Sequence, residues 1–498
     1  MKSLFPAICA VWMVAGAAAQ TAPTAGEIAD RLTANDLKAD VSFLASDALE
    51  GRGTPSRGLD IAAEYIAAQF RRAGLEPAGD DGYFQTAPFL SVTPNLDGLE
   101  LTIQIGDKVI QPGHSSIAVV DPVAVDLGKT LAVWVSAAAT ERLNALTPEQ
   151  VRGKVLIIDS AASGPGGRGG GRAPATLLAR LRPALVLLLL ARPGGRVSTS
   201  AAQLRDASAA AVPVLLVWDE AVRKALDEAG PAEVAISAKI AAPSSVPVKL
   251  RNVVGVLRGS DPALKDTYVL VTAHYDHLGV RGTGEGDHIF NGANDDASGT
   301  ASVIEIAHTL ASFPSHPKRS VVFVALFGEE AGLLGSRYYA RHPVFPLAKT
   351  VADINLEQVG RTDVDNGSRV GLVNVTGYDF TTLPRALKKA GEEFDIQVLK
   401  DERNSDSYFA RSDNQAFADA GVPAHTLSVG YMFPDYHQVG DEWNKLDYEN
   451  MAKVDRTVAL AILLLADSTA APEWNAANPK TERYVKAYQG LELPATSK

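Results

Sequence analysis

From residue 246 onward, short apolar runs alternate with segments that are long enough to form helices. The expected strands are 253–257, 268–273, 321–327, 351–356, 370–375 and 424–429. The expected helices are 297–313, 333–341 and 383–392. Strands that alternate with helices form a mostly parallel sheet with helices on both faces, so the sequence predicts an α/β core. In such a sheet, sites form outside the carboxyl ends of the strands.

Acidic and histidine side chains stand at these predicted strand ends. They are His274 and Asp276, Glu329 and Glu330, Glu357 and His437, with Asp295 and Asp296 before the helix 297–313. Taken singly, each position has an ordinary structural explanation, such as a helix N-cap for the aspartate pair. Together they place potential metal ligands at five independent positions, none of them lysine or arginine. Two histidines and several carboxylates form a donor set that suits zinc.

The spacing within two of these segments has a local consequence. In His274-Tyr275-Asp276 the two polar side chains leave the same face of an extended segment, so Asp276 can orient the imidazole of His274. In the pair Glu329-Glu330 the adjacent side chains diverge. One of the two can then bind a metal while the other faces a bound water.

Five ordered segments resemble a known family. They are HYDHLG (274–279), NGANDDASG (291–299), FGEEAGLLGS (327–336), NLEQVGR (355–361) and YHQVGDE (436–442). They resemble segments of the co-catalytic zinc exopeptidases, which include secreted bacterial leucyl-type aminopeptidases and glutamate carboxypeptidase II. The resemblance covers about residues 36–118 and 246–465, and the early segments FLASDALEGRGTPSRG (43–58) and AAEYIAAQFRRAGLEP (62–77) belong to it.

The resemblance implies two zinc ions per chain and a set of five ligands. Asp295 would bridge the two ions. His274 and Glu357 would complete one site, and Glu330 and His437 would complete the other. One departure concerns Glu357, which is aspartate in many relatives, so the geometry or the metal preference of its site can differ.

The same resemblance implies roles around the metals. Glu329 would be the general base, Asp276 would support His274, and Tyr436 would hydrogen-bond the developing oxyanion. A non-proline cis peptide bond is expected between Asp295 and Asp296. A second departure is Asn414, which stands where many relatives have histidine.

The chain is expected to have five parts. They are a signal peptide (1–19), an N-terminal part of the catalytic domain (26–118), an inserted β-rich domain (119–245), the main catalytic part (246–470) and a tail (471–498). The insert, with VRGKVLIIDS and VPVLLVWDE, resembles a protease-associated domain. It is either a lid that limits substrate size or a packing module. Within it, 163–172 is expected to be a solvated loop, 185–190 a buried strand and 241–245 a linker.

Charge and composition narrow the choice of partners and compartment. The net charge is −11 and no basic stripe occurs, which argues against a nucleic-acid partner. Lys2, an apolar run and the small residues 17–19 predict a cleaved signal, so a mature chain beginning near Gln20 would be secreted or periplasmic without stable membrane insertion. The single cysteine, Cys9, lies in that signal. Any zinc in the mature protein must therefore be held by histidines and carboxylates.

The sequence predicts an exopeptidase, most simply an aminopeptidase that releases N-terminal residues from peptides. A carboxypeptidase or dipeptidase of the same fold would need a cation for a substrate carboxylate, and Arg361 or Arg411 would supply it. The resemblance also admits a glutaminyl cyclase with one zinc ion and a metal-free binding protein like transferrin receptor. The oligomeric state and the side-chain specificity are left open.

Overall fold

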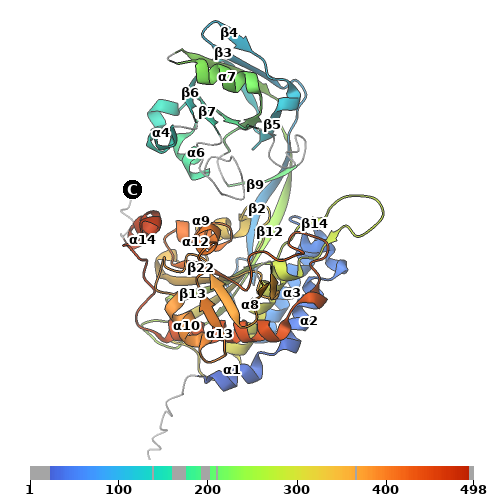
Figure 1. Cartoon of the computed structure of the whole chain (residues 1–498), viewed down its shortest axis with the longest axis vertical. Coiled ribbons are helices and arrows are strands. Elements are labelled where there is room, and N and C mark those ends of the chain that lie inside the picture. Colours follow the sequence, from blue (N-terminus) through green and yellow to red (C-terminus); the bar gives the residue numbers. More distant parts are fainter. Residues whose placement is uncertain are drawn as a thin grey trace, which may run out of the picture.

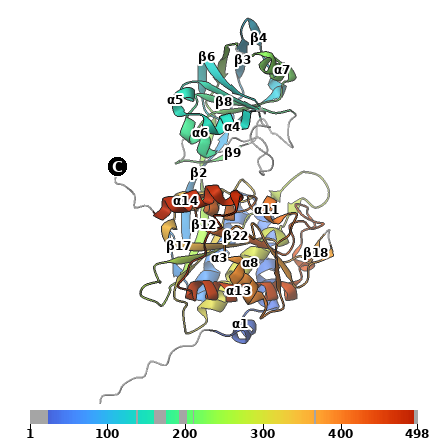
Figure 2. The same ribbon diagram turned by 60° about the vertical axis from the view of Figure 1, so that its left-hand side comes forward.

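The computed structural model describes residues 23–136, 139–159, 175–191, 202–208, 211–230, 232–364 and 367–492. Within these residues the chain forms two large sheets, which lie in separate bodies joined by the long strands β2 and β12 (Figure 1). Figure 2 shows the same separation from another side. The expected signal peptide (1–19) and glycine-rich stretch (163–172) lie outside the described residues.

The larger sheet has ten strands, and its centre is parallel. Four adjacent strands run in the same direction: β22 (Ala424–Ser428), β17 (Thr350–Leu356), β13 (Tyr268–His274) and β16 (Ser320–Leu326). On one side, β12 (Ser244–Leu257), β2 (Phe84–Thr93) and β9 (Gln203–Asp206) continue the sheet antiparallel, and β1 (Glu76–Pro77) pairs with β12. On the other side lie β20 (Leu372–Val375), antiparallel to β22, and β21 (Gln397–Leu399). The fold is therefore α/β as predicted, in a mixed sheet whose parallel block is central.

The central strands are apolar throughout because both of their faces are covered. Every residue of β13 and β16 is buried. Val269 and Phe323 enter one core, whereas Leu270 and Val322, one residue along, enter the other. This alternation follows from the two-residue period of a strand. Continuous apolar runs of this kind are typical of parallel strands between two helical layers.

Two groups of helices cover the two faces. One core contains side chains from α1 (Ala25–Arg31), α2 (Ala34–Leu44), α3 (Arg57–Ala73), α8 (Ser298–Ala311), α10 (Pro384–Gly391) and α13 (Tyr448–Asp467). The other contains side chains from α9 (Leu334–Arg341), α12 (Asn414–Asp419) and α14 (Glu482–Glu492). Helices α2 and α3 belong to the N-terminal part of the chain. Ser56 caps the start of α3 through the amide of Leu59, and Gly74 ends it with a φ of 78°.

The second sheet has eight strands in the order β4-β3-β11-β6-β7-β8-β10-β5. These are β3 (Glu100–Ile105), β4 (Lys108–Ile110), β5 (Ile117–Val120), β6 (Val125–Val135), β7 (Val155–Asp159), β8 (Leu185–Leu189), β10 (Val214–Val217) and β11 (Val234–Ile240). Helices α4 (Thr140–Ala145), α5 (Pro148–Val151), α6 (Ala175–Leu181) and α7 (Glu220–Glu228) accompany it. The apolar run at 185–190 is the fully buried β8, as predicted. This sheet begins at Glu100, earlier than the expected insert at 119, because β3 pairs along its length with β11.

The linker predicted at 241–245 is wrong for its last two residues. Ser244 and Ser245 begin β12 and pair with Thr93 and Val92 of β2. The ladder then continues without a shift to the pair Val253 and Phe84. Local composition favoured a loop, but a partner strand about 150 residues earlier in the sequence supplies the backbone hydrogen bonds that stabilise the strand.

The segment between α13 and the end of α14 packs against the larger sheet. Trp474 stacks on Tyr484 of α14 with ring centroids 5.0 Å apart, and its indole N–H donates to the carbonyl of Gly421. Both rings belong to the core beneath α9 and α12. Among the helices of the described residues, none is both long enough and apolar enough to cross a bilayer.

Candidate metal centre

The predicted ligands meet at the carboxyl edge of the parallel block. His274 is the last residue of β13, and Glu357 directly follows β17. Glu330 lies four residues after β16 ends, and His437 lies in the loop that follows β22. Asp295 comes from the turn before α8, whose N-terminus faces the same edge. Parallel strands end at one side of the sheet, so residues far apart in sequence are brought together there.

One cluster consists of His274, Asp295 and Glu357. Each offers one ligand atom, and these atoms lie within 4.8 Å of one another. Nε2 of His274 is 3.3 Å from Oδ1 of Asp295. All three residues are buried. They are the residues that the resemblance assigned to the first zinc site.

A second cluster forms on the other oxygen of Asp295. His437 Nε2 lies 3.1 Å from Oδ2 of Asp295 and 2.9 Å from Oε1 of Glu330. His277 also contributes, because its Nδ1 lies 3.3 Å from the same oxygen of Glu330. His277, Asp295 and Glu330 again offer ligand atoms within 4.8 Å. Asp295 is thus shared by both clusters, which is the bridging position predicted for it.

His277 was not among the predicted site residues. It follows Asp276 directly in HYDHLG, and its side chain is 1% exposed. Its imidazole and that of His437 face each other edge to face, with centroids 5.6 Å apart. The sequence did contain a signal for it, because His277 is the third polar residue within four positions at the end of β13.

The donor atoms of these clusters fit a metal ion. Both carboxylate oxygens of Asp295, Nε2 of His274 and both ring nitrogens of His277 are buried without a hydrogen bond among the described residues. The short contacts around them lack hydrogen-bond geometry. Buried polar groups are normally satisfied, and several that converge on one place need a common partner. Nitrogen and carboxylate donors at such positions suit zinc.

Comparison with known proteins agrees with this geometry. Residues 252–462 match the family model described as peptidase family M28. This part of the chain belongs to the M28 peptidase family. All the predicted ligands and both clusters lie within these matched residues.

Individual relatives cover parts of the chain. It is 36% identical over 269 residues to a "Probable zinc metalloprotease" of Pyrenophora tritici-repentis, a match over 45% of this chain and 59% of that protein. It is 28% identical over 221 residues to "Aminopeptidase YwaD" of Bacillus subtilis, over 43% of this chain and 44% of that protein. These matches span less than two thirds of the relatives' own lengths. The solved aminopeptidase of Aneurinibacillus sp. strain AM-1 shares the fold, with a TM-score of 0.51, 20% identity, and coverage of 92% of this chain and 98% of that one.

The electrostatics of the M28 centre reflect crowded buried carboxylates. Burial raises the pKa of Asp296 well above its ordinary value, and repulsion from Glu357 and Asp295 adds to the shift. Burial and Asp295 also oppose ionisation of Glu330, but His277 and His437 outweigh them and lower its pKa to about 2. Burial opposes protonation of His437, yet Asp295 and Glu330 raise its pKa to about 9. The opposite shifts of Glu330 and His437 arise in part from the contact between these two side chains.

Asp276 supports both His274 and the turn that carries Glu329. Its Oδ1 lies 3.5 Å from Nδ1 of His274, and its main-chain carbonyl lies 3.2 Å from the same nitrogen. Oδ1 also accepts a 3.0 Å hydrogen bond from the amide of Glu329. Oδ2 accepts one from the hydroxyl of Thr54, also 3.0 Å long. With Nδ1 of His274 held by Asp276, Nε2 is turned toward Asp295 and can act as a ligand.

Arg52, in the turn formed by residues 51–53, supports the loops behind the clusters. Its side chain is fully buried, and burial lowers the pKa of the guanidinium to about 10 although the surrounding aspartates oppose this. It donates to the carbonyls of Tyr275, Asn291 and Gly292 at 2.7–2.9 Å, and to that of Leu44. One cation therefore fixes the loop after β13 and the turn before Asp295.

Asp441 anchors the turn of Asp295 from the other side. Its carboxylate accepts hydrogen bonds of 2.9 and 3.1 Å from the amide of Asn294 and one of 3.1 Å from the amide of Asp295. Burial raises the pKa of Asp441 to about 6. Neither Asp441 nor Arg52 was predicted to support the site, because a single buried charge leaves no periodic signal in the sequence.

The remaining predicted features are placed as follows. The peptide bond between Asp295 and Asp296 is cis, as expected. Tyr436 stacks on His437, with ring centroids 4.0 Å apart and planes inclined by 21°. Asn414 is buried and bonds the carbonyl of Phe409 and the hydroxyl of Thr426, so it serves the packing of α12.

Proposed function

We propose that this M28 protein is a zinc-dependent aminopeptidase. The observation that carries the proposal is the pair of buried donor clusters that share Asp295. A shared carboxylate suits two metal ions at close range, which is the arrangement of two-metal hydrolases. The names of the relatives, a zinc metalloprotease and an aminopeptidase, support the same reaction class.

Two zinc ions would be held by the residues of these clusters, with Asp295 common to both sites. His274 and Glu357 would hold the first ion, and Glu330 and His437 would hold the second, with His277 beside them. When bound, the ions supply Lewis acidity toward a water molecule and the scissile carbonyl.

The side chains of the chain perform the proton transfers. Glu329 is 2% exposed, and its carboxylate contributes to the field that acts on His274, which places its charge near the first cluster. We assign it the role of general base, which takes a proton from the attacking water and returns it to the leaving amine. Tyr436, stacked on His437, is assigned the hydrogen bond to the developing oxyanion.

The excess of carboxylates favours a substrate with a free α-amine. An ammonium or amine next to Asp295, Glu330 and Glu357 gains an attraction that an acylated nitrogen lacks. A glutaminyl cyclase with a single zinc ion has no use for the second cluster. A binding protein of the same fold does not require the complete donor set that is present here.

The first test measures metal content and substrate preference on one preparation. The protein, loaded with zinc and dialysed, is assayed on aminoacyl anilides and on the same compounds with an acetylated amine. We expect about two zinc ions per chain, and hydrolysis of the free amines only. Equal kcat/KM for free and acetylated substrates would show that the enzyme is not an aminopeptidase.

A second test separates the two adjacent glutamates. Glu329→Gln keeps the shape of the side chain and should retain both zinc ions while kcat falls by about 10²–10⁴. Glu330→Gln should instead weaken the second zinc site. Elemental analysis and kinetics on both variants give the answer. If Glu329→Gln loses zinc and Glu330→Gln keeps it, the two roles are exchanged.

We also propose that the protein is exported through the N-terminal signal, on the basis of the pattern in residues 1–19. Mass spectrometry of the protein from its native host should give an N-terminus near Gln20. Recovery of a chain that begins at Met1 would contradict export by cleavage.

A further inference from the structure

A pocket opens beside Glu357, a residue of the first cluster. Its volume is about 360 Å³, counting the part open to solvent. Its lining residues are Glu357, Gln358, Thr376, Tyr408, Arg411, Ser412, Thr426, Ser428, Tyr431 and Tyr436. A substrate held at the metals would extend a neighbouring group into this space.

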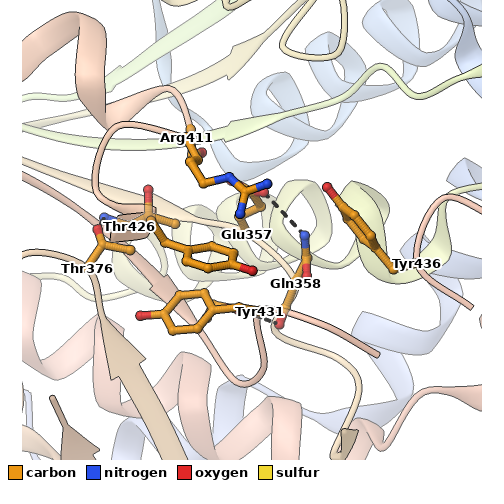
Figure 3. A pocket seen from close by; sticks show the side chains of 10 residues that line it. Glu357, Gln358, Thr376, Arg411, Thr426, Tyr431 and Tyr436 are labelled. Carbon is orange, nitrogen blue, oxygen red and sulfur yellow. Dashed lines mark hydrogen bonds between the residues drawn. The ribbon is translucent and has the colours of Figure 1, made fainter. Parts of the chain in front are cut away.

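Arg411 is the cation of this pocket. Figure 3 shows its guanidinium reaching toward Glu357 and Gln358, with Tyr436 beyond them. Its guanidinium carbon lies 4.3 Å from the ring centre of Tyr408, and it forms no salt bridge with a described carboxylate. Glu357 is the only carboxylate among the lining residues, and the proposed function engages it with a metal ion. Arg411 then remains as the uncompensated charge.

Arg361 is the other arginine that the sequence suggested for a substrate carboxylate, and it is already paired with carboxylates of the chain. It is 3% exposed and bonds both oxygens of Asp363 at 2.6 Å and one oxygen of Asp435 at 2.9 Å. These partners hold it in the loop that follows β17. Arg361 therefore has a structural role, whereas Arg411 lines the pocket.

The rest of the lining includes hydroxyl groups that can donate hydrogen bonds. The phenolic hydroxyl of Tyr431 is buried and has no hydrogen-bond partner among the described residues. The hydroxyl of Ser412 accepts a hydrogen bond from Asn355 and keeps its own proton to donate. Thr376 likewise accepts from the amide of Thr426. A planar guanidinium with neighbouring hydroxyl donors is the arrangement that binds a carboxylate.

We infer that this pocket binds a carboxylate of the substrate, with Arg411 as the residue that determines this specificity. The inference rests on the proposed peptidase function. The carboxylate has two sources, the acidic side chain of an N-terminal glutamate or aspartate, and the free α-carboxylate of a short peptide such as a dipeptide. Either source predicts a preference for anionic over matched neutral substrates.

The test compares pairs of substrates that differ only in this charge, with the zinc-loaded full chain. One arm uses glutamyl and glutaminyl anilides, and the other uses alanyl dipeptides with a free or an amidated C-terminus. A charged hydrogen bond predicts a ratio of kcat/KM of about 10- to 100-fold in favour of the anionic member in one arm. The arm that shows the ratio identifies the source.

Variants then assign the ratio to Arg411. Arg411→Met should bring the ratio close to one, and Arg411→Lys should keep part of it because the charge remains without the planar fork. The exposed Arg403, in the same region of the chain, gives the matched control, since Arg403→Met should keep the wild-type ratio. Ratios near one in both arms, with neutral substrates still hydrolysed, would overturn the inference while the peptidase function stands. If no substrate is hydrolysed by the zinc-loaded protein, the proposed function itself fails.

Discussion

Replacing Asp276 by asparagine should weaken zinc binding at the first cluster without unfolding the protein. Asp276 is fully buried and serves His274, the amide of Glu329 and the hydroxyl of Thr54. The asparagine oxygen can keep the amide of Glu329, and the new NH2 group can turn to Thr54, because a hydroxyl also accepts. The shape and the hydrogen bonds therefore survive, and the lost quantity is the negative charge behind His274.

The expected loss of zinc affinity follows from the removal of this charge. Loss of an outer partner of a metal-binding histidine typically lowers metal affinity by about 10–100-fold, or ~1.4–2.8 kcal/mol. Asp276→Ala removes both acceptors, so it also leaves the buried amide of Glu329 without a partner, which costs about 1–3 kcal/mol of folding stability. The alanine variant should thus lose stability when metal-free, whereas the asparagine variant should not.

The assay titrates metal-free wild-type and variant proteins with zinc against a chelating dye and records urea unfolding of the same metal-free samples. Asp276→Asn should show one weakened site and one of wild-type affinity, because the structure places Asp276 behind His274 of the first cluster. Two outcomes would refute the reasoning. One is wild-type affinity at both sites, and the other is an equal loss of metal-free stability in the asparagine and alanine variants.

Three further changes have defined outcomes. His277→Gln should lower the affinity of the second zinc site at least about tenfold, measured by the same titration, whereas His308→Gln, remote from the clusters, should not. Gly292→Ala should lower the urea-unfolding stability of the metal-free protein by more than about 1–2 kcal/mol, because its φ is 59° and an added Cβ would lie 2.4 Å from the ring of His277. His425 is held neutral by burial, which lowers its pKa from 6.5 to about 4, so its contribution of up to about 3 kcal/mol is complete above pH 6.5 and is lost as pH falls toward 4. Unfolding measured against pH should therefore be flatter in this window for His425→Gln.

The sequence predicted the parallel block and its site because both depend on local signals. Apolar runs bounded by polar residues placed β13 and β16 within one residue of their observed ends, and the strand-end rule then placed His274 and Glu357 at the same edge of the sheet. The start of the second sheet and of β12 depends instead on partners over a hundred residues away, and composition alone does not reveal such pairing.

Residues that support the site were missed for a different reason. Arginine is rarely fully buried, so no pattern in the turn at 51–53 marks Arg52 as the donor to three loop carbonyls. Asp441 resembles any loop aspartate until the amides of Asn294 and Asp295 are brought to it. Supporting residues of this kind become recognisable only when the loops they connect are placed in space.

The second sheet is attached where it does not disturb the metal centre. The chain leaves the larger sheet through β2 and returns through β12, and neither strand contributes a ligand. Their uninterrupted ladder extends away from β16, so an insertion between them leaves the four parallel strands in register (Figure 1). The attachment is also braced, because β9 returns to pair with β2, and Asp206 at its end bonds Arg341 of α9 at 2.7 Å. Since α9 follows the segment that carries Glu329 and Glu330, this contact ties the inserted part of the chain to the catalytic edge.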